Sequence, residues 1–538
     1  MSRIISTPSQ QRLSAGGRRR IGVPGLCVIV AILALTTGGT ARAASCTEPM
    51  AAAAGLAGDL RATLDLGALR HLYEAGSCLW SEGDADTLLA VLGRAGREGL
   101  DAGDYHVADL ADRAGQDSRQ RDILLSDAAL RYARDMRDGR VGLESLAEDI
   151  DFRRPSIDPV AGLGDALRRH ALGDWLASLA PSQPEYARLV GAFGRYRRLA
   201  AEGGWAVLPM PARSVRPGQT SPIVPALRRR LAAEGDVAET GTDAEAGGDR
   251  LDGDLVRGLR HFQSRHGLDA DGILGKKTIA ALNVSASARA NQIAMNLERW
   301  RMLSSGIEPT RIEVNAAAAT ATLYIGGTPQ LAMRAVVGKA KTQTPILRSA
   351  IRAVIVNPPW VVPASIIRKE ILPTLKRNPD YLEEHDMYWR GDQIVQRPGE
   401  ENSLGRLKFE LSSSFDVYLH DTPARGLFAR DERARSHGCV RLEKPLDLAE
   451  RLLKGDPEWS RERIEQAIAE GETQRIATPE AVQVVIVYWT AFVDADGSVE
   501  FRNDIYGRDS RLMAALEQRK PRPYVTSALA GKGCGESS

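Results

Sequence analysis

A cysteine with the surroundings of a reactive thiol lies late in the chain, in the run Ser-His-Gly-Cys-Val-Arg that ends at Arg441. A thiolate is a strong nucleophile, and a nearby imidazole, an arginine or a helix N-terminus lowers the pKa of the thiol. His437 and Arg441 flank Cys439, and an amphipathic pattern that begins at Pro445 predicts a helix start just after the cysteine. The loop is basic, polar and contains Gly438, so core packing explains this cysteine poorly. We therefore expect Cys439 to be a nucleophile.

The nucleophile needs a base, and two histidines compete for that role. His420 lies at the end of a predicted strand, so it would meet Cys439 through folding rather than through local spacing. His437 is two positions from the cysteine and shares a face with it if the chain is extended there. A third group often orients the base in such sites. The sequence offers Asp421 and Ser436 as alternative candidates for this orienting group.

The other candidates contact the substrate. Backbone N–H groups at Gly438 and Cys439 would hold a developing oxyanion, because glycine lets the backbone approach a bound carbonyl closely. A planar guanidinium at position 441 suits a substrate carboxylate. The side chains expected to line the substrate cleft are those of Arg441, Tyr418, Trp360, Ser436 and Asp421.

The residues around the cysteine resemble a known family. The run Ser436 to Arg441, with His-Asp-Thr-Pro upstream at 420–423, resembles the signature of L,D-transpeptidases with a YkuD-type catalytic domain. The longer stretches 417–423 and 427–430 resemble the large multi-domain YcbB-like branch of that family. The resemblance implies that Cys439 is the nucleophile and that His420 is the general base.

The resemblance also implies a substrate. The donor would be a peptidoglycan stem tetrapeptide, which acylates Cys439 as a thioester when its terminal D-residue leaves. The acceptor would be the side-chain amine of a second stem, which gives a 3→3 cross-link. Family members also hydrolyse such links or attach protein to the wall, so L,D-carboxypeptidase and attachment activities stay open. Carbapenems typically acylate the family, and we expect such inhibitors to react with Cys439.

Three other classes compete with this interpretation. A metallohydrolase would use as ligands His420, Asp421, His437 and Cys439. The resembled family is metal-free, so we expect no metal and no other cofactor. A papain-like endopeptidase would cleave ordinary L,L-peptides. A non-catalytic peptidoglycan-binding protein would use its helical modules and carry the cysteine incidentally.

The N-terminus predicts export. Basic residues at 18–20, an apolar run from Leu26 to Leu35 and small residues up to Ala44 predict a signal peptide over 1–44. The apolar run is too short to span a bilayer. We expect the periplasm or cell envelope, where Cys46 and Cys78 could pair. Peripheral association with the inner membrane or with wall-synthesis enzymes stays open. The net charge of +2 gives no argument for nucleic acid.

A chain of 538 residues is long enough for several domains. Helical periodicity runs to about residue 205, and a helix, Gly-rich turn and helix then resemble a peptidoglycan-binding-like domain. Strand patterns begin at residue 311. The expected fold is multi-domain α+β, in which a mainly-β YkuD-type catalytic domain with a helical lid insertion follows two helical domains. The expected boundaries are a signal peptide 1–44, a helical scaffold domain 45–208, a linker 209–222, a three-helix peptidoglycan-binding-like domain 223–285 with a mobile insertion 234–254, a connecting helix 286–310, a catalytic domain 311–455 with a lid at about 358–400, and an extension 456–538 that completes the sheet.

Overall fold

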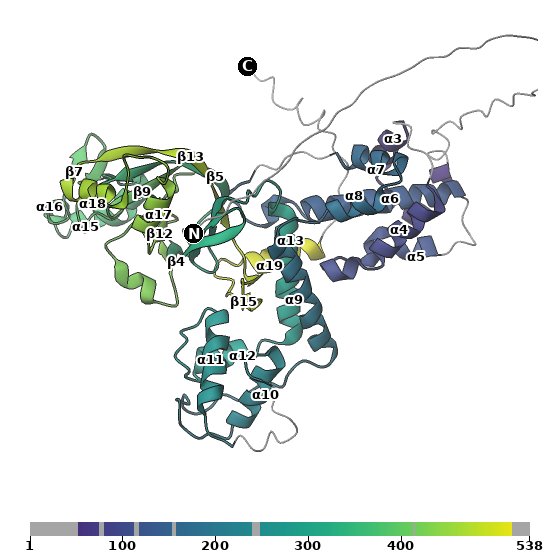
Figure 1. Ribbon diagram of the computed structural model, residues 1–538, viewed down its shortest axis with the longest axis horizontal. Coiled ribbons are helices and arrows are strands. Elements are labelled where there is room, and N and C mark those ends of the chain that lie inside the picture. The colour runs from purple at the N-terminus through teal and green to yellow at the C-terminus, as the bar shows by residue number, and fades with distance from the viewer. Residues whose placement is uncertain are drawn as a thin grey trace, which may run out of the picture. The chain divides into compact units, whose positions relative to one another are not determined.

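The computed structural model describes residues 52–74, 80–111, 118–152, 158–238, 248–412 and 415–518 (Figure 1). The expected signal peptide, Cys46 and Cys78 lie outside these residues. Within them, no helix is both long and apolar enough to cross a membrane.

The N-terminal part is helical, as its periodicity predicts. Polar side chains cap the N-termini of two of its helices. Ser81 Oγ accepts a hydrogen bond from the Asp84 N–H, and Asp158 caps the helix that begins at Pro159. Leucine and alanine side chains fill the space between the helices. The helices are α2 (Gly58–Thr63), α3 (Leu66–Glu74), α4 (Glu82–Leu92), α5 (Val107–Ala111), α6 (Ser118–Asp138), α7 (Pro159–Arg168), α8 (Leu172–Ser178) and α9 (Pro184–Ala201).

A short strand in this helical part differs from the prediction. Strand β1 (Ile150–Asp151) pairs in parallel with β5 (Ile346–Val356), which belongs to the catalytic sheet. The helical segment therefore contributes backbone to the sheet. A strand of two residues shows no alternating pattern, so periodicity could not reveal it.

The small module contains the three expected helices, α10 (Val224–Glu234), α11 (Gly253–Arg265) and α12 (Lys276–Leu282). The predicted linker is attached to it, because Val215 and Leu274 exchange two backbone hydrogen bonds of 3.2 and 2.9 Å. The middle of the predicted insertion, 239–247, lies outside the described residues. At its start, Glu234 is buried and Asp236 pairs with Arg265 at 2.6 Å, so this end is anchored in the module.

Helix α13 (Ala286–Leu303) is the expected connecting helix, and it packs along α9 (Figure 1). The catalytic sheet follows it. Its strands are β2 (Arg311–Asn315), β3 (Thr320–Ile325), β4 (Thr328–Gly338), β5, β9 (Leu407–Leu411), β10 (Leu419–His420), β11 (Ala434–Ser436), β12 (Val440–Leu442) and β13 (Gln474–Val487).

The strand order is β5, β13, β2, β3, β4, β12, β10, β9, and β9 also pairs with β5. These strands therefore form a closed ring, which leaves fewer unpaired edges. Its interior contains side chains such as Val314, Phe409, Leu419 and Val484, all fully buried. Helix α17 (Pro445–Leu452) begins where its pattern predicts, and α18 (Arg461–Glu470) follows it.

Strand β13 is not an addition at the edge of the sheet. It pairs in parallel with β2 and antiparallel with β5, so the ring cannot close without it. Residues 474–487 belong to the predicted C-terminal extension, and they complete the catalytic sheet. The chain then continues through β14 (Ala491–Val493), β15 (Val499–Phe501) and α19 (Arg508–Glu517).

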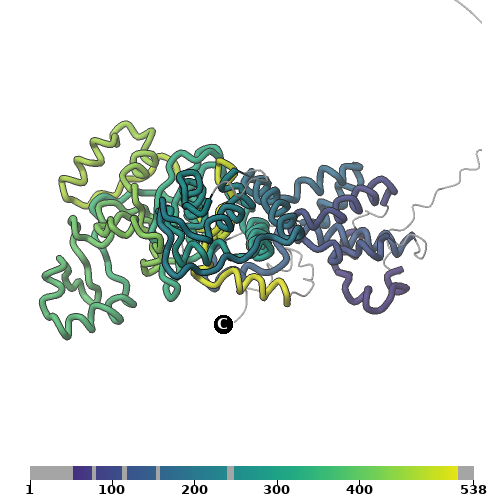
Figure 2. The backbone as a smooth tube through the Cα atoms, turned by 90° about the horizontal axis from the view of Figure 1, so that it is seen from below, coloured from purple at the N-terminus to yellow at the C-terminus, as the bar shows by residue number. Residues whose placement is uncertain are grey.

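The lid insertion combines helices with a small sheet. It contains α14 (Ala364–Ile366), a π-helical turn at Ile367–Ile371, α15 (Leu372–Leu375) and α16 (Tyr381–Glu384). A three-stranded sheet accompanies them, formed by β6 (Trp360–Val361), β8 (Gln393–Gln396) and β7 (Met387–Arg390). Figure 2 shows this green segment as a separate lobe of the backbone path. The insertion is therefore helical, as predicted, and contains in addition a small sheet that the sequence did not indicate.

Candidate active site

Two parallel strands bring the predicted catalytic residues together. Strand β10 pairs with β12 so that Leu419 is opposite Val440 and His420 is opposite Arg441. Leu419 and Val440 are fully buried in the ring. Because side chains alternate along a strand, the residues on either side of this pair point to the other face. His420 and Arg441 therefore share one face with Tyr418 and Cys439.

The thiol of Cys439 is half-buried at the start of β12, and its sulfur lies 3.8 Å from the Asp416 carbonyl. Burial raises the pKa of the Cys439 thiol. Hydrogen bonds from Tyr418 and the positive charges of Lys408 and Arg441 act against that rise. The sulfur is thus a protonated thiol surrounded by groups that favour its ionised form.

His420 is a buried, neutral imidazole, only 3% exposed. Burial and the charge of Arg441 lower the pKa of His420 to about 3. Its ring meets the Tyr418 ring edge-on at 5.6 Å between centroids, and its Nδ1 has no hydrogen-bond partner in the described part of the chain. A neutral imidazole with a free ring nitrogen can accept a proton.

Neither predicted orienting side chain contacts this imidazole. The Asp421 carboxylate accepts a hydrogen bond of 2.9 Å from the Arg406 N–H and lies 3.3 Å from Arg425. Ser436 instead hydrogen-bonds to backbone groups of Gly438 and Cys439. Backbone groups of Asp421 and Leu404 are the ones that hydrogen-bond the ring and raise the pKa of His420 against burial.

The nucleophile loop, residues 436–439, is bent rather than extended. Ser436 Oγ donates to the Cys439 carbonyl at 2.6 Å and accepts from the Gly438 N–H at 3.1 Å. Gly438 has a φ of 122°, which is open to glycine alone. The expected shared face of His437 and Cys439 therefore does not form. The Gly438 N–H is already engaged, and β12 separates Cys439 from α17, so no helix N-terminus adjoins the thiol.

His437 points to the lid. Its Nε2 lies 2.6 Å from Glu370 Oε1, on the π-helical turn. Trp360, also in the lid, hydrogen-bonds the Tyr418 hydroxyl. The lid therefore contacts the site at two points. Trp360 lies close enough to Tyr418 to influence the pKa of its hydroxyl, and Arg441 keeps a buried Nε without a partner in the described chain.

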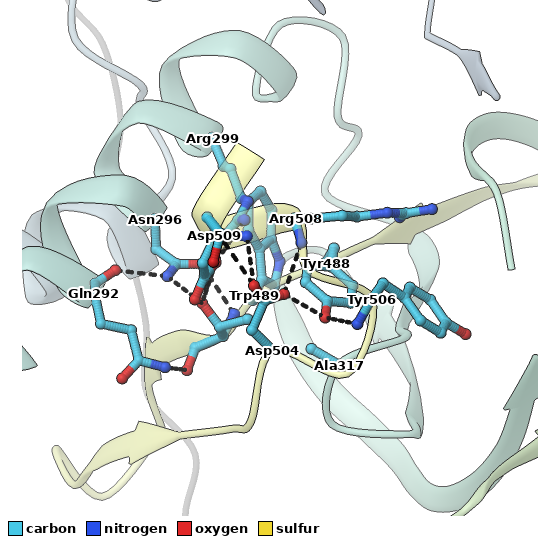
Figure 3. Close-up of polar contacts among 12 residues, drawn as sticks. Gln292, Asn296, Arg299, Ala317, Tyr488, Trp489, Asp504, Tyr506, Arg508 and Asp509 are labelled. Atoms are coloured by element: carbon cyan, nitrogen blue, oxygen red, sulfur yellow. Dashed lines mark hydrogen bonds and ion pairs between the residues drawn. The ribbon is translucent and has the colours of Figure 1, made fainter. Parts of the chain in front are cut away.

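Sequence reasoning missed several residues that support the loop. Thr344 is fully buried, and its Oγ1 donates to the Gly438 carbonyl at 2.8 Å and accepts from the Gly338 N–H at 2.9 Å. Tyr506 donates to the Gly338 carbonyl at 2.7 Å, and Arg508 contacts Gln343 at 3.1 Å. Figure 3 shows both residues beside Asp504 and Asp509. Nothing in the local sequence links positions so far apart.

Lys408 was also missed as a site residue. Its ammonium lies 4.1 Å from the centre of the Tyr418 ring, and it lowers the pKa of Cys439. The alternation along its strand would have placed it on the thiol's face once the pairing of β9 with β10 was known. Across the described ranges, no three His, Cys, Asp or Glu side chains gather closely enough to hold a metal ion.

Three family profiles match successive parts of the chain. Residues 67–192 match a "Scaffold domain", 220–282 a "Putative peptidoglycan binding domain", and 309–459 the YkuD "L,D-transpeptidase catalytic domain". A curated relative from Haemophilus influenzae, described as "Putative L,D-transpeptidase", is 33% identical over 244 residues. That match covers 42% of this chain, and the chain spans about half (49%) of the relative's length.

Solved structures give weaker similarity. An L,D-transpeptidase from Mycobacterium smegmatis is 15% identical, with a TM-score of 0.19 over 33% of this chain and 58% of that one. An L,D-transpeptidase from Xylanimonas cellulosilytica is 14% identical, with a TM-score of 0.17 over 52% of this chain and 99% of that one. Residues 309–459 therefore form an L,D-transpeptidase catalytic domain of the YkuD type, and a scaffold domain and a peptidoglycan-binding domain precede it in the chain.

Proposed function

We propose that the protein is a peptidoglycan L,D-transpeptidase that forms 3→3 cross-links through a thioester on Cys439. The observation that carries this proposal is the shared face of β10 and β12, where a half-buried thiol lies beside a buried neutral imidazole and two cations. The family match and the peptidoglycan-binding domain support the substrate class.

In the first half-reaction, the Cys439 sulfur attacks the carbonyl carbon of the donor stem. The thiol proton passes to His420, and the cations Lys408 and Arg441 stabilise the sulfur as it ionises. The C–N bond to the terminal D-residue then breaks, and the leaving amine takes up the proton. A thioester and the free D-residue result.

In the second half-reaction, the amine of an acceptor stem attacks the thioester carbon. A C–N bond forms, the C–S bond breaks, and the electron pair returns to the sulfur of Cys439. The amine proton passes back through the base. If water takes the place of the amine, the same site is an L,D-carboxypeptidase, which is the second candidate. Protein-to-wall attachment would use the same thioester with another acceptor, an amine of the attached protein.

The test is incubation with purified disaccharide-tetrapeptide, followed by mass analysis of the protein and of the products. We expect a thioester adduct on the wild type, a cross-linked dimer, and neither with Cys439→Ala. Carbapenem-type inhibitors should form an adduct on the same residue, because they too are acylating agents. An adduct of equal yield on Cys439→Ala would refute the nucleophile.

We further propose that the protein acts in the periplasm or cell envelope. The basic, apolar and small-residue segments of the first 44 residues support export. Fractionation of cells that express the full chain tests this. Recovery of the uncleaved protein only in the cytoplasm would contradict it.

A further inference from the structure

A cleft, which we call the basic cleft, is lined in part by Ala434 of β11 and Arg334 of β4, and β4 also pairs with β12, which follows the nucleophile loop. Its volume is about 950 Å³. It is lined by the turn between α11 and α12, by α12 and the start of α13, by the loop after β2, by segment 429–435 and by residues 501–505. The lining includes neither Cys439 nor any residue of the lid.

The cleft is positively charged. Seven arginine and lysine side chains line it, against three carboxylates. Lys277 pairs with Asp431 at 2.7 Å and with Glu432 at 3.3 Å, while Arg334 and Arg502 pair with Glu443 and Glu500, which do not line the cleft. The Arg430 side chain is exposed and has no polar partner in the described part of the chain. A positive cleft of this kind favours an anionic ligand.

Two buried side chains that line the cleft have unsatisfied polar atoms. Arg289 is 7% exposed, and its two terminal nitrogens donate to Gln292 at 2.9 Å and to the Ala281 carbonyl at 3.3 Å. Its Nε has no hydrogen-bond partner in the described chain, and no carboxylate there lies within ion-pair distance of it. His266 is 5% exposed, and its Nδ1 donates to the Phe262 carbonyl at 2.8 Å. Its Nε2 is therefore an acceptor, and it too has no partner.

Buried polar groups normally have partners. A guanidinium and a neutral ring nitrogen together match a ligand with a carboxylate and a nearby N–H or O–H. Peptides with free carboxylates, attached to a sugar, have both.

The position of the cleft links it to the chemistry. Segment 429–435 continues directly through β11 into the nucleophile loop, so Arg435 is followed within four positions by Cys439. The lid contacts Tyr418 and His437 through other residues, Trp360 and Glu370. A transpeptidase handles two stems in succession, and two separate approaches to one sulfur suit such a reaction.

We propose that the basic cleft binds the acceptor stem peptide, through its carboxylates, while the donor occupies the lid side as a thioester. This proposal rests on the proposed function and assigns a place to its second substrate. The cleft would hold the acceptor while its amine attacks the thioester carbon, as the C–S bond breaks and the sulfur recovers its electron pair.

The experiment measures how the thioester divides between the two outcomes. The full-length protein is incubated with purified disaccharide-tetrapeptide, and three products are quantified: released terminal D-residue, cross-linked dimer and hydrolysed tripeptide. The variants are Arg430→Glu, which reverses one charge, and Ala270→Trp, which narrows the cleft from an exposed position. Arg229→Glu is the matched control, since Arg229 is exposed on α10 and does not line the cleft.

We expect the ratio of dimer to tripeptide to fall about tenfold or more in both cleft variants. A fall of this size corresponds to the loss of one charge-assisted contact with the acceptor. Release of the D-residue should persist, and Arg229→Glu should match the wild type. Thermal unfolding identifies a variant that fails to fold. An unchanged ratio of dimer to tripeptide in both folded variants would overturn the proposal. An equal loss of D-residue release and of dimer would also overturn it, because that result would assign the cleft to the donor. Absence of any thioester on the wild type would refute the proposed function instead.

Discussion

At the scale of single residues, Cys439 and His420 are both uncharged before substrate binds. Burial raises the pKa of the thiol and lowers that of the imidazole, so each group resists the charge that the reaction requires. Lys408 and Arg441 favour the thiolate, but the same charges disfavour a protonated His420. In the proposed reaction, the proton would therefore pass from the thiol to the imidazole as the sulfur attacks the substrate carbonyl, which takes the developing negative charge.

The buried imidazole predicts a dependence of stability on pH. The folded-state pKa of His420, about 3, lies below the ordinary value of 6.5. Between these two values, His420 binds a proton in the unfolded chain but not in the folded chain. The free energy of unfolding therefore decreases as pH falls from about 6.5 towards 3. Between pH 7 and 4.5 the loss is about 2–3 kcal/mol.

Denaturant unfolding of the wild type and His420→Gln at both pH values measures this loss. The variant should lose less stability than the wild type by that amount. Equal losses in the two proteins would show that His420 is not the responsible group.

At the scale of elements, the nucleophile loop depends on a neighbouring loop, residues 338–344. Thr344→Val keeps the shape of the side chain but leaves the Gly438 carbonyl and the Gly338 N–H unsatisfied. We expect a stability loss of about 2 kcal/mol and a fall of about tenfold or more in acylation, because small displacements of a nucleophile are costly. Intact-protein mass spectrometry with a carbapenem gives the rate. Thr328→Val, at an exposed position on β4, is the control; equal rates in the two variants would contradict the role of Thr344.

The contact of His437 with Glu370 joins the lid to the nucleophile loop. Both side chains are partly exposed, at 35% and 53%, so the pair is worth about 0–1 kcal/mol. Glu370→Gln should therefore increase amide hydrogen exchange in residues 364–375 by up to about fivefold without changing global stability. The exchange of α18 provides an internal reference. Unchanged exchange in the lid would mean that other contacts hold it.

The elements also show how far local sequence determines this fold. Helix α13 and strand β2 begin at their predicted positions, because a capping serine and a change of periodicity mark these starts. The place of β13 between β2 and β5 depends on pairing over more than a hundred residues, which no local pattern encodes. The same holds for the site: the sequence indicates Cys439 and His420 as candidates, whereas Thr344 and Tyr506 become relevant only through the folded backbone.

At the scale of the whole described chain, a buried polar network joins α13 to the C-terminal segment. Asn296 donates to Thr490 Oγ1 at 2.8 Å, Thr490 donates to Asp509 at 2.9 Å, and Arg299 pairs with Asp509 at 2.6 Å (Figure 3). Asp509 is the second residue of α19 and follows Arg508, which contacts Gln343 and Thr344. The helix that follows the peptidoglycan-binding module is thus connected through this network to the loop that supports the nucleophile.

Removal of one partner from this network should lower the free energy of unfolding substantially. Arg299 is 1% exposed, so Asp509→Ala leaves an uncompensated buried charge, and we expect a loss of about 3–5 kcal/mol in denaturant unfolding. Asp447→Ala breaks an ion pair with Arg461 that is about 40% exposed and should cost about 1 kcal/mol or less. The double variant Arg299→Met, Asp509→Leu should recover most of the loss, because it removes both charges together. Similar losses for Asp509→Ala and Asp447→Ala would show that the buried pair does not fasten α13 to the C-terminal segment.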